Sequence, residues 1–198
     1  RDMFLDIEGD VDNNKARYSI ESSGVPGTVA GLIHAQEKYG LLKLKQVMQP
    51  AIALARGGFA VSADLSDSLK SRSQRLQQDS ASKVYFYKPG GDSYELGETL
   101  IQTELGATLA RIANGGREEF YQGKTADLIV AQMEASGGLI SHQDLVNYQV
   151  VERQPVCGDY KKTRVCTMPP PSSGGVHLVQ MLNILEGWDL KDLGHNSA

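Results

Sequence analysis

The sequence predicts an α+β fold that is mainly helical and carries a small β-hairpin portion. Three observations support this prediction. Apolar residues recur at the 3.6-residue helical period over most of the chain, glycines end nearly every periodic segment, and short β-rich runs replace the helical pattern after residue 148. The chain has 198 residues, of which 40% are hydrophobic and 22% charged, as in ordinary globular domains. Such a chain can bury a core without metals or disulfides.

The chain, 1–198, is predicted to be a single fragment that forms one sizeable domain or a tight pair, with three successive stretches. Residues 1–24 are polar and rich in turn residues, which predicts a loop-rich start with little regular structure. Residues 25–148 carry the helical periodicity, and residues 149–198 are expected to form strands and a buried helix. Because the chain begins at Arg1 without a methionine or a signal peptide, we expect either a trimmed domain or an internal fragment of a longer enzyme.

Three helices are predicted in the first part of the helical stretch. The first follows Pro26-Gly27-Thr28 and ends at Gly40, where glycine is expected to take the left-handed cap conformation. The second covers residues 44–55, and Pro50 is expected to kink it or to start a new turn. The third covers Ser62–Gln78, with its first serine as N-cap and only a thin apolar stripe, which is typical of a surface helix.

The later part of the helical stretch begins with a β-rich run, Val84–Tyr87, which predicts a strand or extended segment. Helices are then predicted over Gln102–Ala113 and Glu118–Ala135, each followed by a pair of glycines that should stop it. A short helix from Ser141 to Tyr148 begins with a variant of the capping box.

After residue 148 the pattern predicts strands over Val150–Tyr160 and Thr163–Met168, with a turn at Lys161-Lys162. This hairpin places Cys157 opposite Cys166. If the pair is non-hydrogen-bonded, the two side chains approach closely enough for a cross-strand disulfide. Two free, buried thiols are an equally good interpretation of the sequence.

The most specific string in the chain is Met168-Pro-Pro-Pro-Ser-Ser-Gly-Gly175. Its glycines and hydroxyls precede a helix, which could create an anion site at the helix N-terminus. The alternative, which capping preference favours, is that the proline arm fixes the entry to the helix with a serine as N-cap. The helix itself, residues 176–186, is apolar on nearly every side and is predicted to be buried, or else to be covered by a missing partner or by oligomerisation.

Several function classes are excluded by the sequence. A net charge of −4 without a basic stripe argues against nucleic acid as a partner, and no apolar run approaches the roughly 20 residues of a membrane span. Gly123-Lys124-Thr125 is not a phosphate loop, because Glu118 stands where that motif needs glycine. The cysteines and the four histidines lack metal-ligand spacing, so no zinc site is predicted. Those histidines are His34, His142, His177 and His195.

Seven strings, collinear along the chain, together resemble the γ-glutamyltransferase (γ-glutamyltranspeptidase) family of N-terminal-nucleophile hydrolases, in its bacterial form. They lie at residues 1–6, 26–31, 49–59, 119–123, 137–148, 168–175 and 182–186. The resemblance implies part of an αββα sandwich from a precursor that cleaves itself into a large and a small subunit. It also implies that the new N-terminal threonine of the small subunit attacks the γ-glutamyl bond of glutathione, with its own amino group as base. The γ-glutamyl group then passes to water, an amino acid or a peptide, without a metal or organic cofactor.

The resemblance covers only the middle and later part of the large subunit. The catalytic threonine, the serine pair and the paired glycines belong to the small subunit, and the arginine that binds the substrate carboxylate belongs to an R-E-x-A-P string upstream of Arg1. We therefore assign no catalytic, substrate-binding or metal-binding residue here. The implied partner is the small subunit of the same precursor, and the implied location is periplasmic or secreted.

Two alternative functions remain. One is a non-catalytic helical interaction or scaffold module, and the other is a related enzyme that acts on cephalosporin side chains or poly-γ-glutamate.

Overall fold

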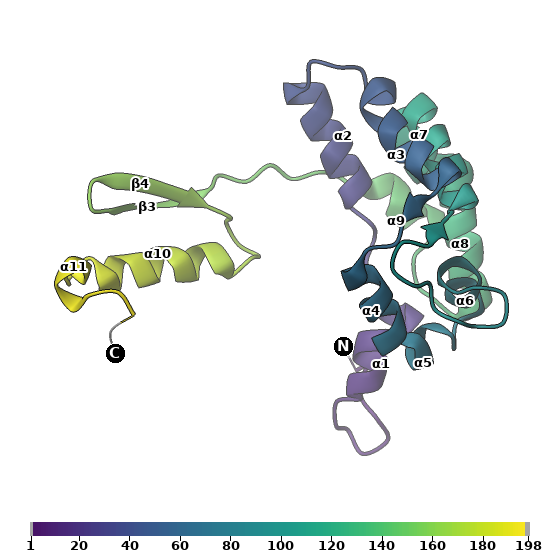
Figure 1. The fold of residues 1–198 in the computed structure, drawn as a ribbon, viewed down its shortest axis with the longest axis horizontal. Helices are drawn as coiled ribbons and strands as arrows, with labels where there is room; N and C mark the ends of the chain where they lie inside the picture. Colours follow the sequence, from purple (N-terminus) through teal and green to yellow (C-terminus); the bar gives the residue numbers. More distant parts are fainter. Residues whose placement is uncertain (1, 197–198) are drawn as a thin grey trace. The chain divides into compact units, whose positions relative to one another are not determined.

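The computed structural model describes residues 2–196, so Arg1 and the last two residues of the chain lie outside it. The chain divides into two compact units, Arg1–Val150 and Val151–Ala198, which we call unit 1 and unit 2 (Figure 1). Unit 1 is helical apart from two short paired strands, and unit 2 holds an antiparallel hairpin and two helices. The predicted fold class, α+β and mainly helical with a small hairpin, is confirmed.

Unit 1 contains ten α-helices or 3₁₀ turns and one pair of strands among its described residues. They are α1 (Asn13–Tyr18), η1 (Ile20–Ser22), α2 (Thr28–Tyr39), α3 (Leu44–Gly57), β1 (Phe59–Ala60), α4 (Ala63–Ser71), α5 (Ser73–Leu76), α6 (Ser80–Phe86), β2 (Thr99–Leu100), α7 (Thr103–Gln122), α8 (Lys124–Ser136) and α9 (His142–Asn147). The expectation of little regular structure before residue 25 is wrong, because Asp12 caps α1 by accepting hydrogen bonds from the backbone N–H groups of Asn14 and Lys15.

The run Val84–Tyr87 is not a strand, because its first three residues end helix α6. The Asp79 carboxylate accepts a hydrogen bond from the Ser82 N–H at 2.7 Å, and this N-cap outweighs the β propensity of the run. The predicted helix Ser62–Gln78 is interrupted at Arg72, which separates α4 from α5. The Ser62 N-cap is confirmed by its bond from the Leu65 N–H.

Two predicted glycine stops behave differently from expectation. Helix α7 continues past residues 114–116 and bends at Gly116, which has a φ of 59°, so the real boundary with α8 is Gly123. Gly40 ends α2 with a φ of −79°, outside the left-handed region, and a Cβ there would meet the Gln36 carbonyl. Gly137, by contrast, caps α8 in the left-handed conformation with a φ of 73°. Helix α3 runs through Pro50 as one helix.

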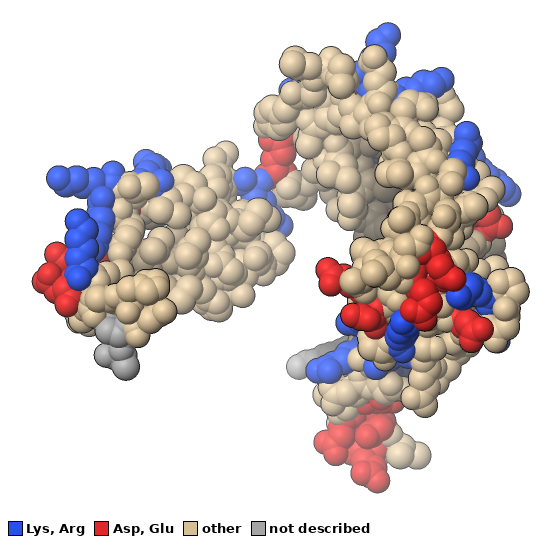
Figure 2. All heavy atoms as spheres, in the orientation of Figure 1, with Lys and Arg blue, Asp and Glu red and all other residues tan. Residues whose placement is uncertain are grey.

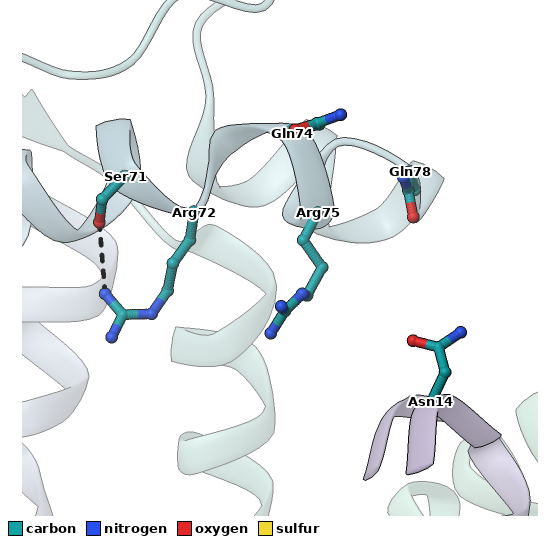
Figure 3. Close-up of a pocket in the computed structure, with 6 residues that line it drawn as sticks. All are labelled: Asn14, Ser71, Arg72, Gln74, Arg75 and Gln78. Atoms are coloured by element: carbon teal, nitrogen blue, oxygen red, sulfur yellow. Dashed lines mark hydrogen bonds between the residues drawn. The ribbon is translucent and has the colours of Figure 1, made fainter. Parts of the chain in front are cut away.

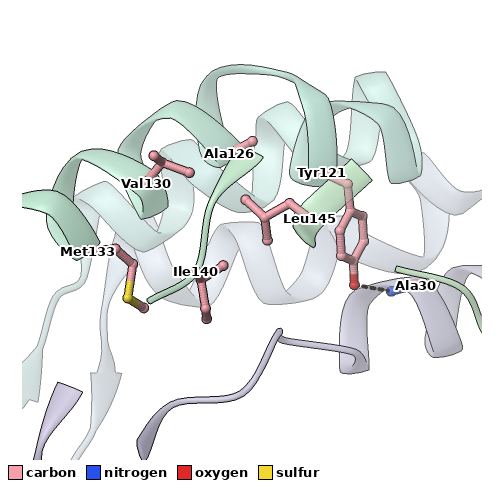
Figure 4. Close-up of a cluster of buried hydrophobic side chains, with 7 residues drawn as sticks. All are labelled: Ala30, Tyr121, Ala126, Val130, Met133, Ile140 and Leu145. Atoms are coloured by element: carbon pink, nitrogen blue, oxygen red, sulfur yellow. Dashed lines mark hydrogen bonds between the residues drawn. The ribbon is translucent and has the colours of Figure 1, made fainter. Parts of the chain in front are cut away.

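The core of unit 1 brings residues of α2, α7, α8 and α9 together (Figure 4). Its members are Ala30, Tyr121, Ala126, Val130, Met133, Ile140 and Leu145. Tyr121 is fully buried, and its hydroxyl donates to the Pro26 carbonyl at 2.6 Å and accepts from the Ala30 N–H at 3.2 Å. Since the N-cap of α2 is Gly27, which has no side chain, Tyr121 supplies that cap from 91 residues away.

A second aromatic ring closes this core. The rings of Tyr121 and Tyr148 are stacked, with centroids 5.7 Å apart, and a Cβ on Gly27 would lie within 2.6 Å of the Tyr148 ring. The Arg117 guanidinium lies 5.0 Å from the Tyr121 ring and donates to the Tyr148 carbonyl. Glycine at position 27 is therefore required by close packing.

Unit 2 contains the strands β3 (Val156–Tyr160) and β4 (Thr163–Thr167), followed by α10 (Gly174–Leu185) and α11 (Leu190–Leu193). The predicted turn at Lys161-Lys162 is confirmed, and both residues have positive φ, as a two-residue hairpin turn requires. Cys157 and Cys166 are paired across the ladder with a Cα–Cα distance of 4.1 Å and form a disulfide, so the free-thiol interpretation is wrong. The strand begins at Val156 rather than at residue 150, because Pro155 cannot donate to a ladder.

The expectation of a buried helix over 176–186 is wrong for this chain. Only Gly175 is buried in α10, while Met181 and Ile184 are 54% and 63% exposed. The hairpin covers one side of the helix, where a Cβ on Gly158 would lie 2.6 Å from Val179. A two-stranded hairpin is too narrow to cover a helix that is apolar all round, so the other side stays open. Within residues 2–196, no helix combines the length and apolar character that a membrane span needs.

Candidate functional site

The string Met168–Gly175 forms the link from β4 to α10. The Ser173 side chain makes no capping hydrogen bond, so the serine-cap interpretation is not supported. Gly175 instead fixes the helix entry, because it packs directly against the Met168 carbonyl group and a Cβ would also lie 3.0 Å from Thr167. The proline arm carries a cis bond between Pro170 and Pro171. The string therefore sets where the helix begins.

The Gly123-Lys124-Thr125 segment joins two helices, as predicted, and its polar groups are already occupied. The Glu119 carboxylate accepts hydrogen bonds from the Thr125 N–H at 3.3 Å and from the Thr125 hydroxyl at 2.9 Å. Arg111 Nε donates to the same oxygen at 3.0 Å. A carboxylate therefore sits where a phosphate loop would hold its phosphate, and it ties α8 to both halves of the bent α7.

The pKa of Glu119 lies below its ordinary value. Burial raises this pKa, but the hydrogen bonds donated by Thr125 and Arg111 outweigh burial and lower it. The sequence shows Glu119 only as part of the string at 119–123 and indicates no role for it. Its partners Arg111 and Thr125 lie eight residues before it and six residues after it, and a bend at Gly116 is needed to bring them together. Its role here is to stabilise the α7–α8 junction.

Glu119→Gln is expected to lower the free energy of unfolding by about 2 kcal/mol at pH 7, the usual size of a charge-assisted hydrogen bond. Since the folded-state pKa is depressed, the stabilisation exists above the unfolded carboxyl pKa of about 4.3 and is lost as pH falls through the folded pKa. Urea titrations between pH 7 and pH 3 should thus show the two proteins converging. Glu118→Gln, at an exposed neighbour, is the control, and a pH-independent difference for Glu119→Gln would contradict this assignment.

The four histidines are dispersed over different helices and the C-terminal segment. His34 lies on α2, His142 on α9, His177 on α10 and His195 after α11. His142 contacts Asp127 at 3.1 Å and so connects α9 to α8 at the surface. Among residues 2–196, no three His, Cys, Asp or Glu side chains are placed to hold a metal ion.

A depression of about 650 Å³ lies beside α1, α4 and α5 (Figure 3). Its lining is polar and contains no acidic residue: Asn14, Ser71, Arg72, Gln74, Arg75 and Gln78. The Arg75 guanidinium lies 4.0 Å from the centre of the Tyr18 ring, which holds it in place. Both arginines are exposed and the depression contains no nucleophile, so we assign no catalytic role to it.

Comparison with known proteins gives a consistent match over the whole chain. The family model described as gamma-glutamyltranspeptidase matches residues 1–198. The chain is 48% identical to the glutathione hydrolase proenzyme of Escherichia coli over 100% of its own length and 34% of the relative. It matches the crystal structure of Helicobacter pylori gamma-glutamyltranspeptidase with a TM-score of 0.97 and 42% identity, covering 100% of this chain and 57% of that one.

The chain is also similar to relatives that are named as an acylase and as a capsule biosynthesis protein. The Acylase ACY 1 proenzyme of Pseudomonas sp. strain V22 is 42% identical, and the capsule biosynthesis protein CapD proenzyme of Bacillus anthracis is 40% identical. Each match covers 88% of this chain, and these relatives are covered over 31% and 32% of their own length. The chain thus spans about a third of the curated relatives that it matches.

Proposed function

This chain belongs to the γ-glutamyltranspeptidase family, and from that membership we propose that it is a large-subunit segment of an enzyme that cleaves γ-glutamyl bonds in glutathione and related compounds. The observation that carries this proposal is the fold match over the entire chain at a TM-score of 0.97. In the proposed reaction, a threonine of the small subunit takes up the γ-glutamyl group and passes it to water, an amino acid or a peptide.

The contribution of this chain to that enzyme is structural. Tyr121 joins the strings at 26–31 and 119–123, Tyr148 packs on Gly27, and Gly175 fixes the start of α10. Each contact joins parts of the chain that are apart in sequence. Packing thus explains residues in four of the seven family strings, those at 26–31, 119–123, 137–148 and 168–175, and in this proposal the chemistry falls to residues of the other subunit.

The isolated 198-residue chain is expected to release no p-nitroaniline from γ-glutamyl-p-nitroanilide, because the nucleophile of the proposed reaction lies in the small subunit. The matched control is the complete precursor, which should cleave itself and release p-nitroaniline. Turnover by the isolated chain would overturn the assignment of the nucleophile, and a complete precursor that processes itself without γ-glutamyl turnover would overturn the proposed function.

The share of this chain that each relative aligns with favours glutathione as the substrate over the substrates of the acylase and of CapD. The E. coli glutathione hydrolase aligns over the whole chain, whereas the acylase and CapD relatives align over 88% of it. Assays of the complete precursor with glutathione, a glutaryl cephalosporin and poly-γ-glutamate would separate these activities. Faster cleavage of either alternative substrate would replace this proposal.

The proposed partner is the small subunit of the same precursor, and the open side of α10 is the surface offered to it. Apolar side chains exposed there include Leu178, Met181, Ile184 and Leu185. A periplasmic or secreted location belongs to the same proposal, and the Cys157–Cys166 disulfide supports it, because disulfides persist in oxidising compartments.

Ile184→Lys is expected to abolish recovery of the small subunit with the large one, since a charge would replace an apolar contact. Leu41→Lys is the control, because Leu41 is fully exposed on unit 1. Affinity purification after co-expression, with circular dichroism of each variant, measures the effect. Unchanged recovery with Ile184→Lys would exclude this side of α10 as the contact surface.

A further inference from the structure

We propose that the polar depression beside α1, α4 and α5 binds a small anion that carries two or more phosphate or carboxylate groups. Its volume of about 650 Å³ falls within the range of small-molecule sites. The six residues that line it lie outside the seven family strings, so this inference goes beyond the proposed function and does not depend on it.

The lining offers hydrogen-bond donors and no competing carboxylate. Arg72 and Arg75 supply two guanidinium groups, and Asn14 and Gln78 supply side-chain amides. A guanidinium presents its N–H groups in a planar fork that matches two oxygens of a carboxylate or a phosphate. Two such forks favour a ligand with two anionic groups. The lining contains no aliphatic or aromatic side chain, so it does not favour a ligand with a large apolar part.

The protein does not neutralise the two arginines. Within residues 2–196, no Asp or Glu forms an ion pair with Arg72 or Arg75. The two residues are three apart in sequence, and Figure 3 shows both guanidinium groups on the same side of the α4–α5 junction. Like charges one turn apart repel each other, so an anion bound between them would relieve this repulsion.

Contacts within unit 1 restrict both side chains before any ligand arrives. The Arg75 guanidinium lies 4.0 Å from the centre of the Tyr18 ring, so α1 supports it from below by a cation–π contact. Arg72 Nη1 donates to the Ser71 hydroxyl at 3.5 Å. Because these side chains are already restricted, less conformational entropy is lost when an anion binds.

The acidic residues beside α1 have partners of their own. Figure 2 shows acidic side chains at the loop before α1 and basic side chains beside α1 and α5. Asp12 lines an adjoining depression, and its carboxylate caps α1 by accepting hydrogen bonds from the Asn14 and Lys15 N–H groups. The Lys15 ammonium pairs with Glu21 at 3.0 Å. The positive charge of the two arginines is therefore left for a ligand.

Calorimetric titration of the 198-residue chain with pyrophosphate and with citrate, at constant ionic strength, tests the proposal. We expect saturable binding of at least one of them with a Kd below about 1 mM, and no saturation by acetate, which carries a single charge. Tighter binding of pyrophosphate would identify a phosphate ligand, and tighter binding of citrate a carboxylate ligand. Absence of saturable binding by both anions would overturn the proposal.

The complete precursor provides a second measurement of the same site. Its affinity for the tighter anion should equal that of the 198-residue chain, because the proposal requires the depression to be open in the whole protein. Binding that is present in the chain and lost in the complete precursor would show that the rest of the protein covers the depression, and would overturn the proposal.

Charge-removing variants test where the anion binds. Arg72→Gln and Arg75→Gln should each weaken binding about fivefold, the size of one exposed, charge-assisted pair. Lys45→Gln is the matched control, because it removes one positive charge from an exposed residue of α3 that does not line the depression. Its affinity should equal that of the unmodified chain. Equal weakening by all three variants would mean that binding follows net charge alone, which contradicts a site at α5.

Two further variants test the fixed geometry. Arg75→Lys keeps the charge and loses the planar fork, so the affinity should fall about threefold. Tyr18→Leu keeps both guanidinium groups and removes the ring that supports Arg75, and a fall of about threefold is again expected. Tyr39→Leu, at another exposed tyrosine, is the control and should bind normally. Undiminished affinity in both Arg75→Lys and Tyr18→Leu would contradict the role of the supported fork.

Discussion

Tyr121→Ala is expected to destabilise unit 1 by about 4 kcal/mol, the usual consequence of removing a fully buried aromatic ring. The ring stacks on Tyr148 and makes an edge-to-face contact with Phe120, and its hydroxyl caps α2. Truncation to alanine removes all three interactions and leaves a cavity in the core formed by α2, α7, α8 and α9. Urea unfolding followed by circular dichroism measures the loss.

Tyr121→Phe isolates the hydroxyl. The Pro26 carbonyl and the Ala30 N–H both lose their partner, so we expect a loss of about 1–3 kcal/mol. Burial raises the pKa of Tyr121, which keeps the hydroxyl protonated and able to donate at neutral pH. The control is Tyr39→Phe, at a residue that is 73% exposed, for which less than about 0.5 kcal/mol is expected. Equal effects of the two substitutions would show that the hydroxyl does not cap α2.

Gly175→Ala is expected to destabilise unit 2 by about 3 kcal/mol, at the upper end of overpacking effects. The added methyl group would overlap the Met168 carbonyl, which is backbone and cannot rotate away, and would press on Thr167 at the end of β4. Either α10 or the end of the hairpin must move. Both elements belong to unit 2, so unit 1 should keep its stability.

The neighbouring glycine provides a matched control for that substitution. A Cβ on Gly174 would meet only the Ser172 hydroxyl, at an ordinary 3.6 Å, so Gly174→Ala should be neutral or slightly stabilising through helix propensity. Trp188 is the single tryptophan of the chain and lies in unit 2, so its fluorescence reports that unit. Identical urea midpoints for Gly175→Ala and Gly174→Ala would refute the close approach of Gly175 to the strand.

Local signals in the sequence predicted the elements that depend on neighbours a few residues away. Ser141 and Asp144 exchange the hydrogen bonds of a capping box at the start of α9. Lys161-Lys162 closes a two-residue turn, which sets the register that pairs Cys157 with Cys166. The sequence left the disulfide and the free thiols as alternatives, because the choice between them depends on which ladder position the pair occupies.

Other predictions were wrong where a second signal competed with the first. The β-branched and aromatic residues of 84–87 favoured a strand, but the Asp79 cap began a helix that includes the first three of them and ends at Phe86. The glycine pair at 115–116 suggested a stop, yet α7 bends there because the Glu119 carboxylate binds Arg111 before the bend and Thr125 after it. That clamp depends on a bent geometry, which helical periodicity does not encode.

The fold class, the hairpin turn and the family resemblance can all be predicted from the amino-acid sequence, and the resemblance implies that the catalytic residues lie in another subunit. These properties follow from short-range periodicity, capping and ordered strings. Two features are visible only in the folded chain: Tyr121 caps a helix 91 residues away, and one side of the apolar α10 stays open. The reason is physical: hydrogen-bond partners and burial depend on what the folded chain brings together, and apolar character in a sequence does not specify which surface will cover it.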